Sequence, residues 1–281
     1  MKKIILFTLT LLFICNLICF AKIDKLYDYE IPVSISVNNQ FIKTDQSGFI
    51  YNNLTYVPIR FVSRALNTDN IFWNDNEFSA TITKDNKEIK LFVGENFAYV
   101  NGMKKEIEGS IILKNQRVFV PVRFISEEFM CDVSWDEEFY IVNLSNNNIE
   151  ISANNIDRNT DYDSILWLAR IIEAESGGEP FKGKIGVGNV IMNRVKSNEF
   201  PNTIYGVIFD KKHGVQFQPV MNNTIYKTPS RDSIVAAKLA LNSHNTVGKS
   251  LYFLNPKIAT NFWIVANRRF FINIKNHDFY L

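Results

Sequence analysis

Glu175 is the residue of this sequence whose type and spacing most favour acid–base chemistry. It follows Ile165, Leu168 and Ile172 at helical steps, so its carboxyl group is expected on the apolar face of a helix. Burial disfavours the charged form of a carboxyl group, and the negative end of a helix dipole repels it, so both raise its pKa. A carboxyl group that keeps its proton near neutral pH can donate it to a leaving oxygen. Glu175 is therefore a candidate general acid, although a glutamate in this position also often pairs with a buried arginine.

The helix that must position this carboxyl group has recognisable start and stop signals. Asp161 or Asp163 can accept hydrogen bonds from the free backbone N–H groups of the first turn. The glycines at 177–178 are expected to end the helix in the left-handed conformation. Pro180 suits the first turn of a second helix, expected over residues 181–195.

Residues 174–180 read Ala-Glu-Ser-Gly-Gly-Glu-Pro. This run resembles the Ala-Glu-Ala-Arg-Gly-Glu-Pro signature of the spore cortex-lytic and cell-wall hydrolase family of SleB type. The resemblance places the family's catalytic glutamate on Glu175. Ser176 and Gly177 replace the family's Ala-Arg, and the resulting Glu-Ser pair resembles the broader soluble lytic transglycosylases, which makes Ser176 a candidate substrate-binding residue. It extends through Asn-Arg-Val at 193–195 and Phe-Pro-Asn-Thr-Ile at 200–204, and so covers nearly all of residues 164–281.

Three later segments that resemble the same family supply further candidate substrate-binding residues. The run at 216–220 is expected to form a strand and turn, in which Gln216 could bind sugar hydroxyls or an N-acetyl group and Phe217 could line the cleft. For these two, roles in the surface and the core are equally open. Asn255 precedes a proline and is thereby held out of the helical region. His277 lies in the Asn-His-Asp-Phe-Tyr run, where a hydrogen-bonded structural histidine is the favoured alternative.

The resemblance implies an α+β chain with a mainly helical, lysozyme-like catalytic domain and a small β element. It also implies cleavage of the β-1,4 bond between N-acetylmuramic acid and N-acetylglucosamine, in degradation of the cell wall or of the spore cortex at germination. Glycoside hydrolysis ordinarily uses two carboxylates. The sequence shows no second acid in a position as convincing as that of Glu175, although the fold could bring Asp210 or Asp232 near it. This favours a lytic transglycosylase. A hydrolytic muramidase or glucosaminidase with the same glutamate, and a non-catalytic cell-wall binding protein, stay open.

The first half of the chain contains a duplicated unit. Residues 56–63 (Tyr-Val-Pro-Ile-Arg-Phe-Val-Ser) recur 63 positions later as residues 119–126 (Phe-Val-Pro-Val-Arg-Phe-Ile-Ser). Val-Asn-Asn at 37–39 recurs as Val-Asn-Gly at 100–102, and both suit type I′ turns. Each repeat is expected to form a hairpin, a strand, a short helix and further strands. The β-rich region over residues 22–145 resembles the copper amine oxidase N-terminal-like domain, often duplicated in secreted bacterial proteins.

The N-terminus and the middle of the chain carry weaker signals. Two lysines and the apolar run at residues 4–20 precede Ala21, which is typical of a secretory signal peptide over residues 1–21, with an uncleaved membrane anchor as the alternative. The protein is therefore expected to be secreted to the cell wall or spore envelope. Residues 146–163 are rich in asparagine and predict a linker between the duplicated domain and the catalytic domain at 164–281.

Composition excludes other classes of protein. The 31 basic and 29 acidic residues give a net charge of +2, which does not suit a nucleic-acid binder. No Cys/His cluster has metal-ligand spacing, all three histidines lie beyond residue 145, and Cys131 reads as a core thiol, so no metal, copper included, and no cofactor is expected. The expected partner is the glycan strand of peptidoglycan. The duplicated domain is hypothesised to anchor the protein to the wall, and any accessory protein is left open.

Overall fold

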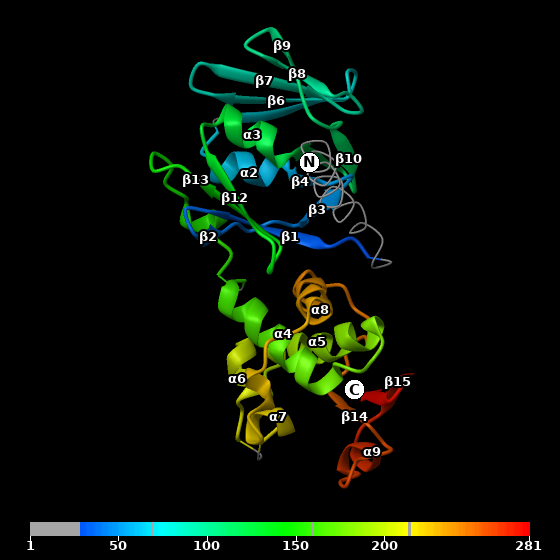
Figure 1. The fold of residues 1–281 in the computed structure, drawn as a ribbon. Helices are drawn as coiled ribbons and strands as arrows, with labels where there is room; N and C mark the ends of the chain where they lie inside the picture. The colour runs from blue at the N-terminus through cyan, green and yellow to red at the C-terminus, as the bar shows by residue number, and fades with distance from the viewer. Residues whose placement is uncertain (1–28, 69, 159, 213–214) are drawn as a thin grey trace, which may run out of the picture. The chain divides into compact units, whose positions relative to one another are not determined.

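The computed structural model describes residues 29–68, 70–158, 160–212 and 215–281, and its internal contacts divide the chain into two units (Figure 1). The first unit comprises the chain up to Asn38 with Ser47–Val133 and Leu144–Asn155; the second comprises Asn39–Gln46, Ser134–Asn143 and Ile156–Leu281. The first is β-rich and the second mainly helical with a small sheet, which confirms the predicted α+β class. The predicted signal peptide at residues 1–21 lies outside the described residues, and the predicted domain boundaries at 145 and 163 stay predictions.

The first unit is built on the duplication. Its antiparallel strands follow the order β10-β11-β4-β3-β1, with the bounds Ile112–Lys114, Arg117–Pro121, Leu54–Pro58, Gly48–Tyr51 and Pro32–Val37. The central pair β11–β4 joins the two repeats through equivalent residues, since Val120 lies opposite Val57. Three buried rings, those of Phe49, Tyr56 and Phe119, form a core cluster on this sheet. Burial of equivalent apolar positions thus explains why the repeated motif is kept in both copies.

A second sheet of this unit is an antiparallel meander in the order β5-β6-β7-β8-β9, with the bounds Asn70–Asn74, Ser79–Lys84, Lys87–Phe92, Phe97–Val100 and Met103–Glu106. The turn between β8 and β9 has φ of 48° at Asn101 and 79° at Gly102. The matching turn of the first repeat has φ of 49° at Asn38 and 63° at Asn39. Positive φ at both central positions confirms the two predicted type I′ turns.

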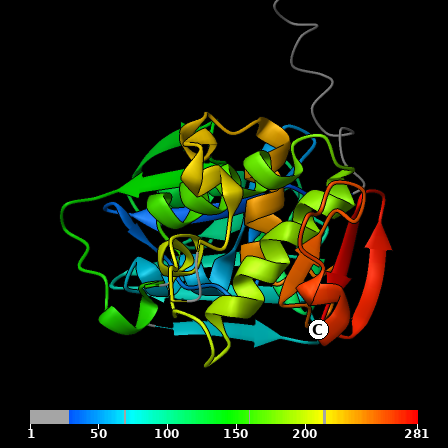
Figure 2. The same ribbon diagram turned by 90° about the horizontal axis from the view of Figure 1, so that it is seen from below.

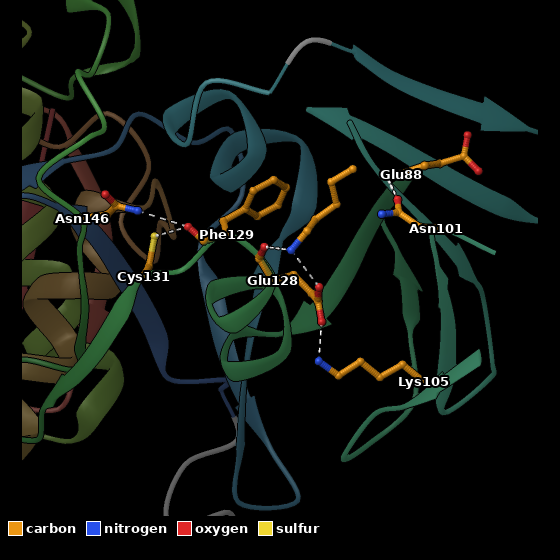
Figure 3. Close-up of polar contacts among 8 residues, drawn as sticks. Glu88, Asn101, Lys105, Glu128, Phe129, Cys131 and Asn146 are labelled. Carbon is orange, nitrogen blue, oxygen red and sulfur yellow. Dashed lines mark hydrogen bonds and ion pairs between the residues drawn. The ribbon is translucent and has the colours of Figure 1, made fainter. Parts of the chain in front are cut away.

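The short helices α2 (Ile59–Ala65) and α3 (Val122–Glu128) begin directly after Pro58 and Pro121, as the repeated motif predicts. Glu128, the last residue of α3, is buried. Its carboxylate forms ion pairs with Lys87 of β7 and Lys105 of β9, which connect the helix to the meander (Figure 3). Cys131 follows the helix and is buried, which confirms the predicted core thiol.

The second unit is organised around three helices that pack on one another (Figure 1): α4 (Tyr162–Ser176), α5 (Phe181–Val195) and α8 (Arg231–Leu241). Asp161 caps α4 by accepting a hydrogen bond from the Ser164 N–H at 2.6 Å, as predicted. Gly188 of α5 permits the close packing, because a Cβ there would lie 2.9 Å from Cδ1 of Ile172 and 3.0 Å from Cβ of Ala240. The core therefore fixes α4, which carries Glu175, against both neighbours.

The end of α4 corrects one prediction. Gly177 has φ −52°, in the right-handed region, and Gly178 is not left-handed either. Glycine is instead required at 177 by close approach, since a Cβ would lie 2.8 Å from the carbonyl oxygen of Glu173. Pro180 then precedes α5, whose bounds match the predicted residues 181–195.

A three-stranded antiparallel sheet completes the second unit in the order β14-β16-β15, with the bounds Tyr252–Leu254, His277–Tyr280 and Phe270–Ile274. In Figure 2 the C-terminal strands lie to one side of the helices. Lys275 in the β15–β16 turn has φ 53°, a conformation that glycine adopts more easily.

The predicted strand at 216–220 is wrong: Phe217 is extended, but Gln218–Met221 form the short helix α7 with Pro219 in its first turn. Proline suits that turn and outweighs the alternation of apolar residues.

The remaining elements are short: β2 (Gln40–Phe41), β12 (Asp132–Asp136), β13 (Ile141–Ser145), α6 (Ile204–Ile208), α9 (Trp263–Asn267), and 3-10 turns at Ala153–Asn155 and Thr224–Tyr226. Within the predicted linker, Ile149 and Ile151 are buried, so that segment is less solvated than its asparagine content suggests. Among the described residues, no helix combines the length and the apolar content needed to cross a bilayer.

Candidate active site

A cleft of about 1410 Å³ lies within the second unit, and Glu175 is one of the residues that line it. The other walls come from the end of α5, the segments around α6 and α7, the sheet strands β14 and β16, and α9 with the residue that follows it. Polar, charged and aromatic side chains all face this space. A large cleft on which several polar groups and a perturbed acid converge is the first candidate for a binding or active site.

Glu175 is the most perturbed acid of the cleft. The last turn of α4 presents it beside the fully buried Ile172, and among the described residues nothing hydrogen-bonds to its carboxyl group. Burial raises the pKa of Glu175 to about 7, although the positive charge of Arg194 acts in the opposite direction. The carboxyl group therefore keeps its proton up to neutral pH, as the sequence predicts for a general acid.

Glu173 lies on the same helix, next to its apolar face. Its pKa is lowered, whereas that of Glu175 is raised. Its carboxylate accepts hydrogen bonds from the N–H of Ser230 at 3.1 Å, from Oγ of Ser233 at 2.6 Å and from Oγ of Ser230, with Nζ of Lys184 4.0 Å away. Burial opposes ionisation, but these hydrogen bonds outweigh it and lower the pKa of Glu173. The residue fixes the start of α8 on α4 as a structural carboxylate.

Arg194 is a cleft residue that the sequence interpretation missed. It occupies the last turn of α5, is only 5% exposed, and lines the cleft with Glu175. Burial lowers the pKa of Arg194 to about 10, so it stays charged at neutral pH. A signal was present: Val187, Val190 and Ile191 precede it at helical spacing, which is the pattern that identifies Glu175.

Gln216, Phe217, Asn255 and His277 all line the cleft with Glu175, so the fold brings four predicted substrate-binding residues to the acid. Phe217 is 3% exposed and therefore serves the core as well as the cleft wall. Oδ1 of Asn255 accepts a hydrogen bond from the N–H of Lys257 at 3.0 Å, which leaves the amide nitrogen as the donor available to a ligand. Their roles as substrate contacts stay predictions.

His277 is held within an aromatic wall. It is buried, its ring centroid lies 5.3 Å from that of Phe253, and its Nδ1 has no hydrogen-bond partner among the described residues. Burial lowers the pKa of His277, so the imidazole is neutral at pH 7. A neutral buried ring suits either an apolar wall or one hydrogen bond to a ligand.

Ser176 does not face the cleft, which corrects its predicted role. Its side chain is 2% exposed, and Oγ donates to the carbonyl oxygen of Ile172 at 2.6 Å, one helical turn back. The residue is absent from the cleft wall. A serine in the last turn of a helix satisfies its hydroxyl locally in this way.

The cleft also contains other carboxylates. Asp210, Glu179 and Glu199 line it, whereas Asp232 does not. Glu179 accepts from Nδ2 of Asn276 at 2.8 Å; burial opposes ionisation, but the hydrogen bonds from Asn276 lower its pKa, so it braces the β15–β16 turn. Asp210 is thus the only one of the two acids named from the sequence that shares the cleft with Glu175.

An aromatic and cationic cluster forms part of the cleft wall. Cζ of Arg268 lies 4.7 Å from the ring centroid of Tyr252 and 5.0 Å from that of Trp263, and its Nη2 donates to the Tyr252 hydroxyl at 2.9 Å. Ring faces of this kind present flat apolar surface with polar edges, which suits sugars. Tyr252 and Arg268 line the cleft and are further residues that the sequence interpretation missed.

Two family models match the chain. The Cell Wall Hydrolase model matches residues 178–280, and the Copper Amine Oxidase N-terminal Domain model matches residues 36–144. The latter range contains no histidine, and its one cysteine, Cys131, is a buried thiol. Across the described residues, no group of three or more His, Cys, Asp or Glu side chains could hold a metal ion, so the residues present do not fit a copper site.

Curated relatives and a solved structure match less than half of the chain. The spore cortex-lytic enzyme of Bacillus cereus is 38% identical over 110 residues, which is 39% of this chain and 41% of that enzyme. That of Bacillus subtilis is 36% identical over 100 residues, or 36% of this chain and 32% of the enzyme. The solved catalytic domain of the germination-specific lytic transglycosylase SleB from Bacillus anthracis is 36% identical, covers 45% of this chain and 100% of that chain, and has a TM-score of 0.41. The chain therefore spans less than half the length of these two cortex-lytic enzymes.

Proposed function

Because the C-terminal half of the chain belongs to the Cell Wall Hydrolase family, we propose that this protein cleaves the glycan strands of peptidoglycan with Glu175 as the acid. The matched relatives are named spore cortex-lytic enzymes, and one solved relative is named a lytic transglycosylase. The action of these relatives on cortex or wall supports a place in the cell envelope for this protein. Glu175 lies three residues before the range that the family model matches, so its role rests on the geometry of the cleft.

The observation that carries the proposal is a single carboxyl group, protonated near neutral pH, on the wall of a cleft. In the proposed reaction Glu175 gives its proton to the glycosidic oxygen as the C1–O4 bond breaks, and the bonding electron pair stays on that oxygen. The Glu175 carboxylate then takes the proton of the C6 hydroxyl while O6 bonds to C1. This closes a 1,6-anhydro ring on the muramyl sugar and restores the neutral acid, so one residue serves both steps.

Asp210 supports a second candidate, a muramidase or glucosaminidase that uses water. It shares the cleft with Glu175 and is not engaged in the way that Glu173 and Glu179 are. A hydrolase needs a second carboxylate at this kind of position, either as nucleophile or as base. The two reactions leave different chain ends, because hydrolysis adds the mass of one water that the anhydro product lacks.

The test compares Glu175→Gln with Glu173→Gln, a matched change on the same helix and at the same cleft. Loss of a general acid reduces the rate by roughly 10²–10⁴-fold, so Glu175→Gln should lose cleavage by that factor while Glu173→Gln keeps most of it. Full cleavage by Glu175→Gln would remove the assignment. Mass spectrometry of wild-type digests should show anhydro ends, and reducing ends would select the hydrolase.

Digests of spore cortex and of vegetative sacculi, run side by side, would identify the preferred wall. A third candidate, a non-catalytic wall binder, predicts that wild-type protein leaves both substrates intact.

For the duplicated domain we propose a wall-anchoring role. The full chain should sediment with purified sacculi better than Ile156–Leu281 alone, which keeps the Asp161 cap of α4, and equal sedimentation of the two would refute that role.

A further inference from the structure

Arg194 has a buried polar atom that the proposed reaction leaves unexplained. Nε donates to the carbonyl oxygen of Leu251 at 2.7 Å, but Nη1 has no hydrogen-bond partner among the described residues. The side chain is 5% exposed, so water does not serve as a ready substitute. An unsatisfied donor of a buried charged group is costly, and its persistence points to a partner in another state of the molecule.

The guanidinium group is held in place by rings. Its Cζ lies 4.8 Å from the ring centroid of Phe200, 5.3 Å from that of Phe217 and 5.4 Å from that of Tyr252. These contacts, with the hydrogen bond to Leu251, prevent the side chain from turning toward solvent. Arg194 therefore presents a fixed positive charge on the wall of the cleft that also contains Glu175.

Arg194 and Glu175 influence each other without being joined. No hydrogen bond or ion pair links them among the described residues, yet the guanidinium opposes the rise of the Glu175 pKa that burial causes. In the other direction, burial lowers the pKa of Arg194, while the charges of Tyr252, Asp210 and Glu175 raise it. While Glu175 is neutral, there is no charge–charge attraction between its carboxyl group and the Arg194 guanidinium.

The other ionisable groups around this pair come from every neighbouring element. Glu173 on α4 accepts hydrogen bonds from Ser230 and Ser233, and Lys184 of α5 lies beside it. Glu179 accepts a hydrogen bond from Asn276. Elsewhere the cleft is lined by Glu199, Asp210, Lys212, Lys227, Arg268 and His277. Among these groups and Tyr252, Arg194 is the one whose charge acts on Glu175.

We propose that Arg194 is the positioning residue for the ionised form of Glu175, with Nη1 donating to the carboxylate once the proton has left. The inference rests on the proposed function of Glu175. After the proton moves to the glycosidic oxygen, the new carboxylate turns toward Nη1 and is held there, oriented to accept the C6 hydroxyl proton. When that proton arrives, the neutral acid releases Arg194 and returns to the starting arrangement.

Side-chain ¹⁵N NMR of arginine-labelled wild-type protein tests this contact without altering Arg194. The Arg194 resonances should shift as pH rises, with a midpoint near the Glu175 pKa of about 7, and should stay flat in Glu175→Gln. Flat resonances in wild-type protein across the Glu175 titration would overturn the proposal. Cleavage by Glu175→Gln is the separate test of the proposed function, so the two failures are distinguishable.

A second arm uses kinetics. Removal of the charge in Arg194→Gln should move the alkaline limb of the kcat/KM profile upward, because Glu175 then keeps its proton to higher pH. At the pH optimum its kcat should fall at least tenfold, while Arg194→Lys, which keeps the charge, should leave the limb in place. An unmoved limb in a folded Arg194→Gln protein would contradict the proposal. If that variant does not fold, the NMR result on the wild-type chain decides.

Discussion

Both units of the chain contain a glutamate near the C-terminal end of a helix, and their environments differ in one respect. Glu128 is the last residue of α3 and forms ion pairs with Lys87 and Lys105 (Figure 3). Burial opposes its ionisation, but the hydrogen bonds from both lysines outweigh that effect and lower the pKa of Glu128. Glu175, near the end of α4, has no such donors in the described part of the chain, and burial raises its pKa to about 7.

The difference separates a structural carboxylate from a reactive one. A buried carboxylate surrounded by donors stays ionised and holds elements together, as Glu128 holds α3 to β7 and β9. A carboxyl group buried without donors keeps its proton and can transfer it, provided that a cleft gives a substrate access. Glu173, two residues from Glu175, shows that a few hydroxyl and N–H donors are enough to change one type into the other.

The largest expected effect of this difference is on stability. Glu175 has a pKa of about 7 in the folded state and an ordinary value of 4.5 unfolded, so its favourable contribution is complete below pH 4.5 and is lost as pH rises through 7. At 1.36 kcal/mol per pKa unit the loss is about 3 kcal/mol. Urea unfolding of wild-type protein and Glu175→Gln should therefore differ in pH dependence, with wild-type losing this stability relative to the variant between pH 4.5 and pH 8. The same decline in both proteins would contradict the assigned environment.

A smaller effect of opposite sign is expected at Glu128. Its lowered pKa means that its contribution is present above the ordinary value of 4.5 and is lost as pH falls through the folded-state pKa. Glu128→Gln removes both ion pairs, and because the lysines are 34% and 50% exposed the cost should be about 2 kcal/mol at pH 7, below that of a fully buried pair.

The exposed neighbour Glu127→Gln is the matched control for this change and should leave urea unfolding unchanged. Peptidoglycan cleavage should be the same in both variants, since neither residue belongs to the second unit. A cleavage defect in Glu128→Gln that exceeds its loss of folded protein would show that the two glutamates are not independent.

Much of the helical framework could be predicted from the sequence because local signals agree there. The apolar series through Ile172, the Asp161 cap and Pro180 all specify the same two helices, and the structure has them. The position of Glu175 on that apolar series follows directly. The duplicated Val-Pro-x-Arg-Phe motifs likewise specify α2 and α3, because proline fixes where each helix begins.

Other features depend on choices that local sequence leaves open. The run at 216–220 has both the alternation of a strand and the proline of a helix start, and in the structure the proline lies in the first turn of the helix α7. From the sequence the Ser176 hydroxyl could bind either a substrate or a nearby carbonyl group, and in the fold it donates to the Ile172 carbonyl one helical turn back. Arg194 carried the same periodic signal as Glu175, but an arginine in the last turn of a helix ordinarily suits the helix dipole at the surface.

The most direct measurement of the central claim is the pKa of Glu175 itself. Protein labelled with ¹³C at glutamate side-chain carboxyl groups, titrated by NMR and assigned by comparison with Glu175→Gln, should give one signal with a midpoint near 7 that the variant lacks. A midpoint for Glu175 near its ordinary value of 4.5 would mean an ionised carboxylate at neutral pH and would contradict its role as the proton donor.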